Sequence, residues 1–482
     1  MKRTLRVPII LLLWIFFAGC PELDPEEIEK PLRVMLSVPG RLEQIVQALD
    51  LDPGEEARVA IMDPETGGYP PVVSVEVTSA SIQAARDGGD YLITGINPGG
   101  MGIVKFSAWG KSGELRVFVR NWKKEEVFRH PLYADTLSYP FDINTPYSPE
   151  YYNDMTPPYK ANRWSSYRLI TDSGFHYEAP DGLSRRITTQ FTDRVHTDSP
   201  REIPGWREIH DTPHIIMERD DIFFVGRGIK TFALNKDVFQ FIVHFENDGD
   251  MVGGFADRQR LELKTMDGTW PPEEERKLEA DRNPANRMYS NGGGDTFTHR
   301  WKFRLPDNFY VSSEYTHIHQ IKPEGGDSGN PTFTLTARRL RSGREVLQLI
   351  YRGPIRANGD PSVNWYPAQV DLEPFKGEWI YAEETVTYDD PGAYRIRLVR
   401  IRDMKVLMEY IYSPEQYDQI DPFVMFRKGN SYIRPKFGLY RRILHMTPFG
   451  LPNMDDPVTE FLAENNEVVV LYADLEMDKL KR

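Results

Sequence analysis

The sequence predicts an all-β protein. Aromatic residues make up 12 % of the chain, and it contains 37 prolines. Short segments that alternate apolar and polar residues recur along most of its length, with glycine, asparagine, aspartate and serine between them, which is the pattern of strands joined by turns. Long segments with helical periodicity are scarce. With 482 residues the chain is long enough for about two or three domains.

Residues 1–19 have the pattern of a signal peptide. A basic start is followed by an apolar segment that is too short to span a membrane comfortably. Phe17-Ala18-Gly19-Cys20 resembles a bacterial lipobox, and Cys20 is the single cysteine of the chain. We therefore expect cleavage before Cys20, a lipid anchor on its thiol and no disulfides.

The acidic, proline-containing residues 20–31 are predicted to form a flexible tether. A tether of this kind resembles the export signal of surface lipoproteins. We expect an outer-membrane lipoprotein exposed at the cell surface, with a periplasm-facing orientation as the alternative.

Residues 32–121 are predicted to form a small β-sandwich. The strand-like segments are 73–78, 91–94, 102–108 and 114–119, with a turn expected at 111–113. Their pattern resembles bacterial immunoglobulin-like domains and contains nothing that looks catalytic. We expect this domain to act as a spacer or an adhesion module.

The remainder divides into two parts. Residues 122–195 are dense in tyrosine and proline, and we interpret them as a linker or a segment wrapped over the next domain. Residues 196–482 consist of strand after strand, which favours one large antiparallel double sheet, a concanavalin-like jelly roll. Its clearest strand-like segments are 239–245, 332–336, 394–400 and 468–473.

The overall charge limits the partners. A net charge of −13 excludes nucleic acid as the expected partner, because phosphates require a basic footprint. Net charge does not exclude a locally basic surface that attracts another anion. The acidic segment 246–250 leaves a structural Ca²⁺ possible, although its composition is also ordinary turn chemistry. We expect no required cofactor.

Three strand-like segments of the large domain carry unusual polar faces. In the first, residues 257–264, a period of two places four charged residues on one face and leucines on the other. Arg260 beside Glu262 could hold a guanidinium rigidly for carboxylate recognition. The ordinary alternative is an ion-pair ladder on a solvated face. The four charged residues are Arg258, Arg260, Glu262 and Lys264.

The second segment, residues 315–322, contains two histidines. Strict alternation places His317 and His319 on one face and Ile318 and Gln320 on the other. Two such histidines could bind a metal, but no third ligand has suitable spacing and no further cysteine exists, so we expect no metal site. A general base or a donor to a carboxylate is the functional alternative to a structural role.

The third segment, residues 434–440, places Arg434, Lys436, Gly438 and Tyr440 on one face. The opposite face carries apolar side chains that would anchor it in the core. A phenol beside fixed positive charge suits an acid/base that works near neutral pH. The ordinary alternative is a surface strand of a solvated sheet.

In this order the three segments resemble motifs of alginate-lyase-like and heparin-lyase-I-like polysaccharide lyases, which share a β-jelly roll. Residues 260–264 resemble the Arg-x-Glu-Leu-Arg motif of alginate lyases, and 436–440 resemble Lys-Ala-Gly-x-Tyr. The histidine segment resembles Gln-Ile-His, with His317 at the glutamine position unless Gln320 serves. Lys264 replaces an arginine and Phe437 an alanine, and Arg434-Pro435 replaces an aromatic pair, which leaves the sugar open.

The resemblance implies β-elimination on an anionic, uronate-containing polysaccharide. Arg260, with His317 or Gln320, would neutralise the uronate carboxylate. Tyr440 would protonate the leaving oxygen and would also serve as the base in syn elimination, whereas His319 would be the base in anti elimination. Lys436 and Arg434 would hold substrate carboxylates and stabilise negative charge on the Tyr440 oxygen. The other expected substrate-binding residues are Arg258, Lys264, Glu262 and Lys322.

Two other functions remain open from the sequence. A glycoside hydrolase on a jelly roll needs two carboxylates that flank the scissile bond, and no strand has the expected Glu-x-Asp-x-x-Glu spacing. A glycan-binding lipoprotein without turnover would keep the aromatic and cationic residues but would not need Tyr440.

Overall fold

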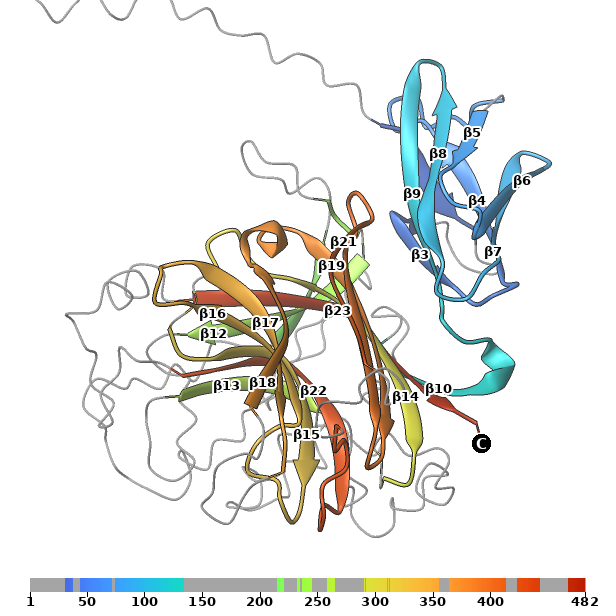
Figure 1. Cartoon of the computed structure of the whole chain (residues 1–482). Helices are drawn as coiled ribbons and strands as arrows, with labels where there is room; N and C mark the ends of the chain where they lie inside the picture. Colours follow the sequence, from blue (N-terminus) through green and yellow to red (C-terminus); the bar gives the residue numbers. More distant parts are fainter. Residues whose placement is uncertain are drawn as a thin grey trace, which may run out of the picture.

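The computed structural model in Figure 1 describes two β-rich parts of the chain. The described residues are 31–37, 44–71, 74–133, 215–220, 232–234, 236–244, 258–264, 290, 292–309, 311, 313–354, 364–412, 423–442 and 467–481. Their regular structure is β-strand apart from the short 3-10 helices η1 (Lys124–Glu126) and η5 (Glu373–Phe375). This confirms the all-β prediction. None of the helices in these ranges is long and apolar enough to cross a membrane. Residues 1–30, including Cys20, lie outside them.

The N-terminal part is a two-sheet sandwich. The first sheet has the order β2 (Gln44–Ile45), β1 (Arg33–Leu36), β4 (Glu56–Met62), β7 (Asp90–Gly95) and β6 (Ile82–Asp87). The second has the order β3 (Ala48–Leu51), β9 (Lys111–Val119), β8 (Met101–Ala108) and β5 (Ser74–Val77). Val59, Ile93, Val104 and Leu115 are fully buried between the sheets. The immunoglobulin-like assignment stays a prediction.

The turn between β8 and β9 lies earlier than predicted. Ala108 pairs with Lys111, so the hairpin turn consists of Trp109 and Gly110 rather than residues 111–113. Both turn residues have positive φ, of 54° and 79°, which is the backbone that a two-residue hairpin requires. The lysine-serine-glycine signal was correct about a turn but misplaced it by two residues.

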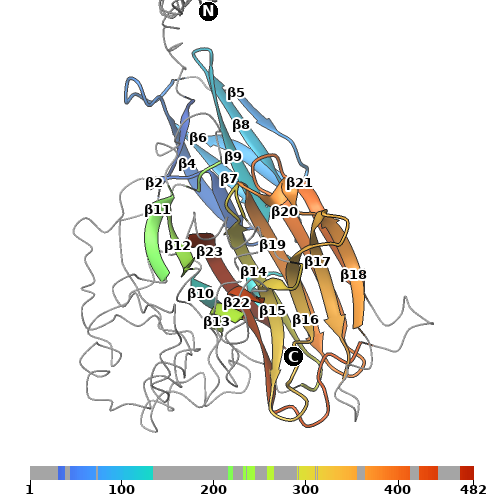
Figure 2. The ribbon, with the colours of Figure 1, turned by 90° about the vertical axis from the view of Figure 1, so that its left-hand side faces the viewer.

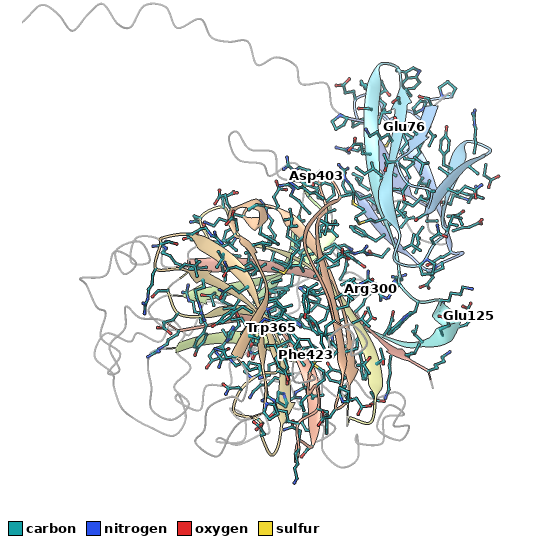
Figure 3. The ribbon with its side chains drawn as sticks, viewed as in Figure 1. Glu76, Glu125, Arg300, Trp365, Asp403 and Phe423 are labelled. Carbon is teal, nitrogen blue, oxygen red and sulfur yellow. The ribbon has the colours of Figure 1, made fainter. Side chains whose placement is uncertain are left out.

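The large part consists of two antiparallel sheets that enclose one core (Figures 1 and 2). The eight-stranded sheet has the order β11 (Ile215–Asp220), β12 (Lys236–His244), β23 (Glu467–Leu480), β14 (Asp295–Arg304), β19 (Trp379–Tyr388), β20 (Ala393–Arg400) and β21 (Lys405–Tyr412), with β10 (Val127–Tyr133) also on β23. The six-stranded sheet has the order β13 (Arg258–Lys264), β22 (Tyr432–Arg442), β15 (Thr316–Glu324), β16 (Phe333–Arg339), β17 (Glu345–Arg352) and β18 (Asn364–Asp371). Apolar side chains of both sheets interdigitate, and Figure 3 labels Trp365 and Phe423 among them.

Strand β10 was not expected from the sequence. It lies within residues 122–195, which we interpreted as a linker or a wrapped segment, yet it pairs with the second half of β23. The first half of β23 pairs with β12 instead. One edge of β23 therefore pairs with β12 along its first half and with β10 along its second half. Alternation within β10 could not predict this pairing, because β23 is far away in the sequence.

The N-terminal sandwich packs directly against the outer face of the eight-stranded sheet (Figures 1 and 2). Phe118 of β9 stacks on Tyr381 of β19, with ring centroids 4.0 Å apart and an interplanar angle of 16°. Arg120 forms an ion pair of 2.9 Å with Glu476, and Lys302 forms one of 2.5 Å with Asp50. Burial of such charges is tolerated because they are paired. The sandwich is thus in direct contact with the large domain, and its role as a spacer or an adhesion module stays a prediction.

Candidate active site

The three polar segments singled out in the sequence are adjacent strands of the six-stranded sheet. Strand β22 lies in the middle, with β13 on one side and β15 on the other (Figure 1). Arg260 and His317 are both cross-strand partners of Tyr440. Segments that are far apart in the chain therefore meet at Tyr440.

This row of partners continues across the whole sheet. His317 pairs with Thr336 of β16. Thr336 pairs with Gln348 of β17, and Gln348 pairs with Gln369 of β18. The Nε2 group of Gln348 donates to Oε1 of Gln369 at 2.8 Å. From β13 to β18 the row is Arg260, Tyr440, His317, Thr336, Gln348 and Gln369. All six residues are polar, so the row forms a polar track perpendicular to the strands, and its middle members His317, Thr336 and Gln348 are buried.

The pairing of β15 with β22 contains a register shift, which corrects the predicted faces of the histidine segment. His317 pairs with Tyr440, and Gln320 pairs with Lys436, so three steps along β15 match four along β22. Ile318 belongs to the core, and His319 contacts the core rings of Trp301 and Phe437.

His317 and Gln320 therefore share the outer face with Tyr440 and Lys436, whereas strict alternation had placed His317 with His319. A β-bulge produces such a change of face, and single-strand periodicity does not reveal it.

His319 does not lie on the outer face, so the base predicted for anti elimination is not this residue. Its Nδ1 atom is 2.9 Å from the carbonyl oxygen of Lys436, and its Nε2 atom is 3.0 Å from Oε2 of Glu384. The side chain is 1 % exposed and lies between the sheets. Both nitrogens already have protein partners, and a substrate on the outer face would not reach them.

Tyr440, His317 and Tyr315 form a compact group on the outer face. The hydroxyl of Tyr315 donates to that of Tyr440 at 3.2 Å, and the Tyr315 ring stacks on His317 with centroids 4.7 Å apart. The His317 and Tyr440 rings are 5.8 Å apart. Nδ1 of His317 is 2.8 Å from Oγ1 of Thr336, which is itself 2.8 Å from Oγ1 of Thr334. The two threonines therefore set the orientation of the histidine ring.

Glu262 connects two sides of this group. Its backbone pairs with Gly438, and its Oε1 atom accepts a hydrogen bond from Nε2 of Gln320, on the far side of β22. Its Oε2 atom is 3.9 Å from Nζ of Lys436. The carboxylate can cross β22 because Gly438 has no side chain. Glu262 thus orients Gln320 and Lys436, a role that differs from the direct substrate contact we expected.

Gly438 is also required by its backbone. Its φ of 136° lies in the region that residues with a Cβ rarely adopt. Gly438 therefore permits the backbone conformation of β22 at the register shift, and its missing side chain leaves room for Glu262 to cross β22.

Arg434 and Lys322 both have partners within the protein. They pair with each other further along the ladder. Arg434 is fully buried, donates to Glu324 at 3.1 Å and lies over the ring of Tyr432. Lys322 donates to the carbonyl oxygen of Ser328. Complete burial contradicts the substrate-binding role expected of Arg434. For Lys322, which is only partly buried, that role stays a prediction.

The remaining expected residues are placed only in part. The backbones of Arg258 and Lys264 pair with Arg442 and Lys436. The side chains of Arg258, Arg260 and Lys264 lie outside the described part of the chain, as do Cys20 and the segment 246–250. Within the described ranges, no group of three or more histidine, cysteine, aspartate or glutamate side chains is arranged to hold a metal ion.

Sequence reasoning missed several residues of this site. Tyr315 begins the predicted histidine strand, two positions before His317, but we gave it no role. Thr334 and Thr336 are two residues apart in β16, so alternation places them on one face of that strand. No pattern within the strand links them to His317, which belongs to β15. No signal in the sequence indicated Glu384, because it belongs to the opposite sheet and contacts His319 in the core behind the site.

Comparisons with known proteins gave matches only among solved structures. No family model matches the chain, and no curated protein matches it. An endo-β-1,4-glucuronan lyase from the fungus Trichoderma reesei has a TM-score of 0.29 and 12 % identity, covering 58 % of this chain and 92 % of its own. A family 7 alginate lyase, A1-II′, in complex with substrate, has a TM-score of 0.30 and 13 % identity, covering 56 % of this chain and 94 % of its own.

Alginate lyase PA1167 from Pseudomonas aeruginosa has a TM-score of 0.28 and 12 % identity, covering 50 % of this chain and 82 % of its own. The chain is thus similar, at low identity and low TM-score, to polysaccharide lyases named for glucuronan and alginate.

Proposed function

We propose that this protein is a polysaccharide lyase that cleaves a uronate-containing anionic polysaccharide by β-elimination. The observation that carries the proposal is the register of the three strands. It places Tyr440 between Arg260 and His317 in one row, and Lys436 beside Gln320 in the next row on the same face. An acid/base pair thereby stands next to amide and cationic donors, which is the set that elimination beside a carboxylate requires.

Elimination first requires stabilisation of charge on the uronate carboxylate. Removal of the C5 proton places negative charge on that group, so fixed donors near it lower the barrier. In our proposal Gln320, Lys436 and Arg260 supply these donors. Glu262 holds Gln320 and Lys436 in place, since it contacts both of them.

We assign the proton transfers to His317 and Tyr440. If Nδ1 of His317 donates to Thr336, Nε2 is the basic nitrogen and accepts the C5 proton. The electrons of the C5–H bond form the C4=C5 double bond, and those of the C4–O4 bond leave on O4. The Tyr440 hydroxyl then protonates O4, while the Tyr315 hydroxyl donates to the tyrosine oxygen and stabilises the charge left there.

The support for a polymer as the substrate is the resemblance of the three segments to polysaccharide-lyase motifs. We further propose that the enzyme is anchored to the outer membrane, at the cell surface, through a lipid on Cys20. The support for this anchor is the lipobox pattern of the sequence.

One assay separates the proposal from its alternatives. The purified protein is incubated with alginate, glucuronan, heparin, chondroitin and ulvan, and ultraviolet absorbance of the unsaturated uronate product is followed. We expect that absorbance to rise with at least one polymer. New reducing ends without absorbance would indicate a hydrolase, and binding with neither signal would indicate a glycan receptor; either result contradicts the lyase proposal.

A further inference from the structure

A buried polar cluster lies between the two sheets, directly behind the candidate site. Its centre is Glu384 of β19, which is completely buried. Oε2 of Glu384 is 2.9 Å from Nδ1 of His299 and 3.0 Å from Nε2 of His319, and Oε1 accepts a hydrogen bond of 2.6 Å from the hydroxyl of Tyr394. The cluster thus joins β14, β19 and β20 of one sheet to β15 of the other.

The surroundings of Glu384 favour the ionised form of its carboxyl. Burial by itself would raise the pKa of its carboxyl, but the positive charge of His319 and hydrogen bonds from His299 and His319 outweigh burial. They hold the pKa of Glu384 well below its ordinary value. An ionised carboxylate only accepts hydrogen bonds, so each of its three partners must donate.

The second nitrogen of His319 also faces an acceptor. Nδ1 lies 2.9 Å from the carbonyl oxygen of Lys436, and a carbonyl oxygen cannot donate. With an ionised Glu384, both ring nitrogens of His319 face acceptors, and only an imidazolium donates to both. His299 differs, because burial lowers its pKa and it binds Glu384 through Nδ1. Glu384 and His319 therefore form an ion pair that spans the core.

We infer that the Glu384–His319 ion pair is the positioning device that sets the register shift between β15 and β22. The shift lies between the His317–Tyr440 and His319–Phe437 pairs, and the atom of β22 that His319 contacts is the carbonyl oxygen of Lys436, one residue beyond it. With His319 held in the core, His317 and Gln320 occupy the outer face. If His319 turned outward, strict alternation would return and Gln320 would turn inward.

Charge burial explains why the shifted register would persist. An outward His319 would leave the Glu384 carboxylate buried without its cationic partner, which is strongly unfavourable. The regular register would also place Gln320 in the core, away from Glu262. His319 and Glu384 are thus positioning residues, and their consequence for activity rests on the lyase function proposed above.

The test combines spectroscopy of the full chain with one matched pair of variants. Histidine-selective ¹⁵N NMR of the wild type, assigned with the variant His319→Gln, should show two protonated ring nitrogens for His319. A neutral His319 with one unprotonated nitrogen would overturn the inference. This measurement needs neither activity nor a destabilised variant.

The matched variants are Glu384→Gln and Tyr394→Phe. Both remove a partner within the cluster, but only Glu384→Gln removes the charge that holds His319. We expect Glu384→Gln to lose the second protonated nitrogen and to lower kcat at least tenfold, whereas Tyr394→Phe should keep the imidazolium and stay within about threefold of wild-type kcat. Equal kcat for Glu384→Gln and Tyr394→Phe would mean that the cluster is merely structural.

A wild type without lyase activity on any polymer would refute the proposed function alone. A neutral His319 would then still overturn the positioning inference, and a two-proton His319 would still support the ion pair on which that inference depends. A neutral His319 in an active wild type would refute only that inference.

Discussion

His317 and Tyr440 face each other across adjacent strands, with their ring centroids 5.8 Å apart and Tyr315 in contact with both. The two residues are far apart in the chain, and they meet because β15 pairs with β22. Their proximity puts a candidate base and a candidate acid on one face of the sheet, where a single sugar linkage can contact both.

Replacing Tyr440 with phenylalanine should abolish proton delivery while keeping the ring. We expect the rate of unsaturated product formation to fall by about 100-fold or more, since general acid–base groups contribute factors of about 100 to 10,000. Initial rates measured by ultraviolet absorbance check this. Tyr366→Phe on β18 is the matched control and should retain activity, because Tyr366 lies four strands from Tyr440. Full activity of Tyr440→Phe would exclude it as the acid.

Thr336 should matter through the orientation of His317. The substitution Thr336→Val removes the hydroxyl that lies 2.8 Å from Nδ1 of His317, and we expect kcat to fall about tenfold with little change in KM. Thr336→Ser restores the hydroxyl and should restore most of the rate. Equal rates for the valine and serine variants would show that this hydroxyl does not orient the histidine.

Gly438→Ala should damage both stability and activity. A Cβ at a φ of 136° introduces backbone strain of about 1–3 kcal/mol, and it stands where the Glu262 side chain crosses β22. Denaturant unfolding and initial rates measure the two effects. Gly343→Ala is the control for strain alone, because its φ is 83° but no heavy atom lies within 4 Å of the added Cβ. If both variants keep full activity, the passage of Glu262 over Gly438 is not needed for function.

The contact between the two parts of the chain should appear in stability. Phe118→Ala removes a fully buried ring that stacks on Tyr381, and we expect a loss of about 3–5 kcal/mol in the free energy of unfolding. Trp109→Ala, at an exposed position of the same sandwich, should change it by less than about 0.5 kcal/mol. Calorimetry should show one shared transition in the wild type. Two transitions, with that of the large domain unchanged in Phe118→Ala, would contradict the coupling.

The buried cluster should make the protein sensitive to acid. Burial lowers the pKa of His299 from its ordinary value of 6.5, so the unfolded chain binds this proton more readily than the folded one. The contribution of His299 to the free energy of unfolding is therefore complete above about pH 6.5 and decreases as the pH falls below that value. Glu384 acts in the same direction below pH 4.5, because its folded pKa is lower than its ordinary value.

Melting temperatures measured between about pH 7.5 and pH 4 test this dependence on acid. We expect the wild type to lose stability from about pH 6.5 downward. The variant His299→Gln should begin that loss at lower pH, since it lacks the buried histidine. A wild-type melting temperature that stays constant down to about pH 5 would contradict the expected loss of stability in acid.

Local sequence patterns were sufficient to predict the strands of the candidate site. Alternation within residues 257–264, 315–322 and 434–440 correctly predicted strands β13, β15 and β22, because side-chain direction in a strand depends on local geometry. The order of these segments also suggested that they act together. Tyr440 and Lys436 share a face as alternation predicted, since β22 keeps its period of two through the site.

Only the tertiary structure decided which histidine belongs to the site. The core provides an acidic partner, Glu384, from the opposite sheet, and His319 turns inward to bind it. That contact is made between distant strands, so no periodicity within β15 could predict it. The sequence by itself determined an all-β chain with polar strands suited to an anionic substrate. Register, burial and charge pairing across the core decided that His317 and Gln320, rather than His319, stand beside Tyr440 and Lys436.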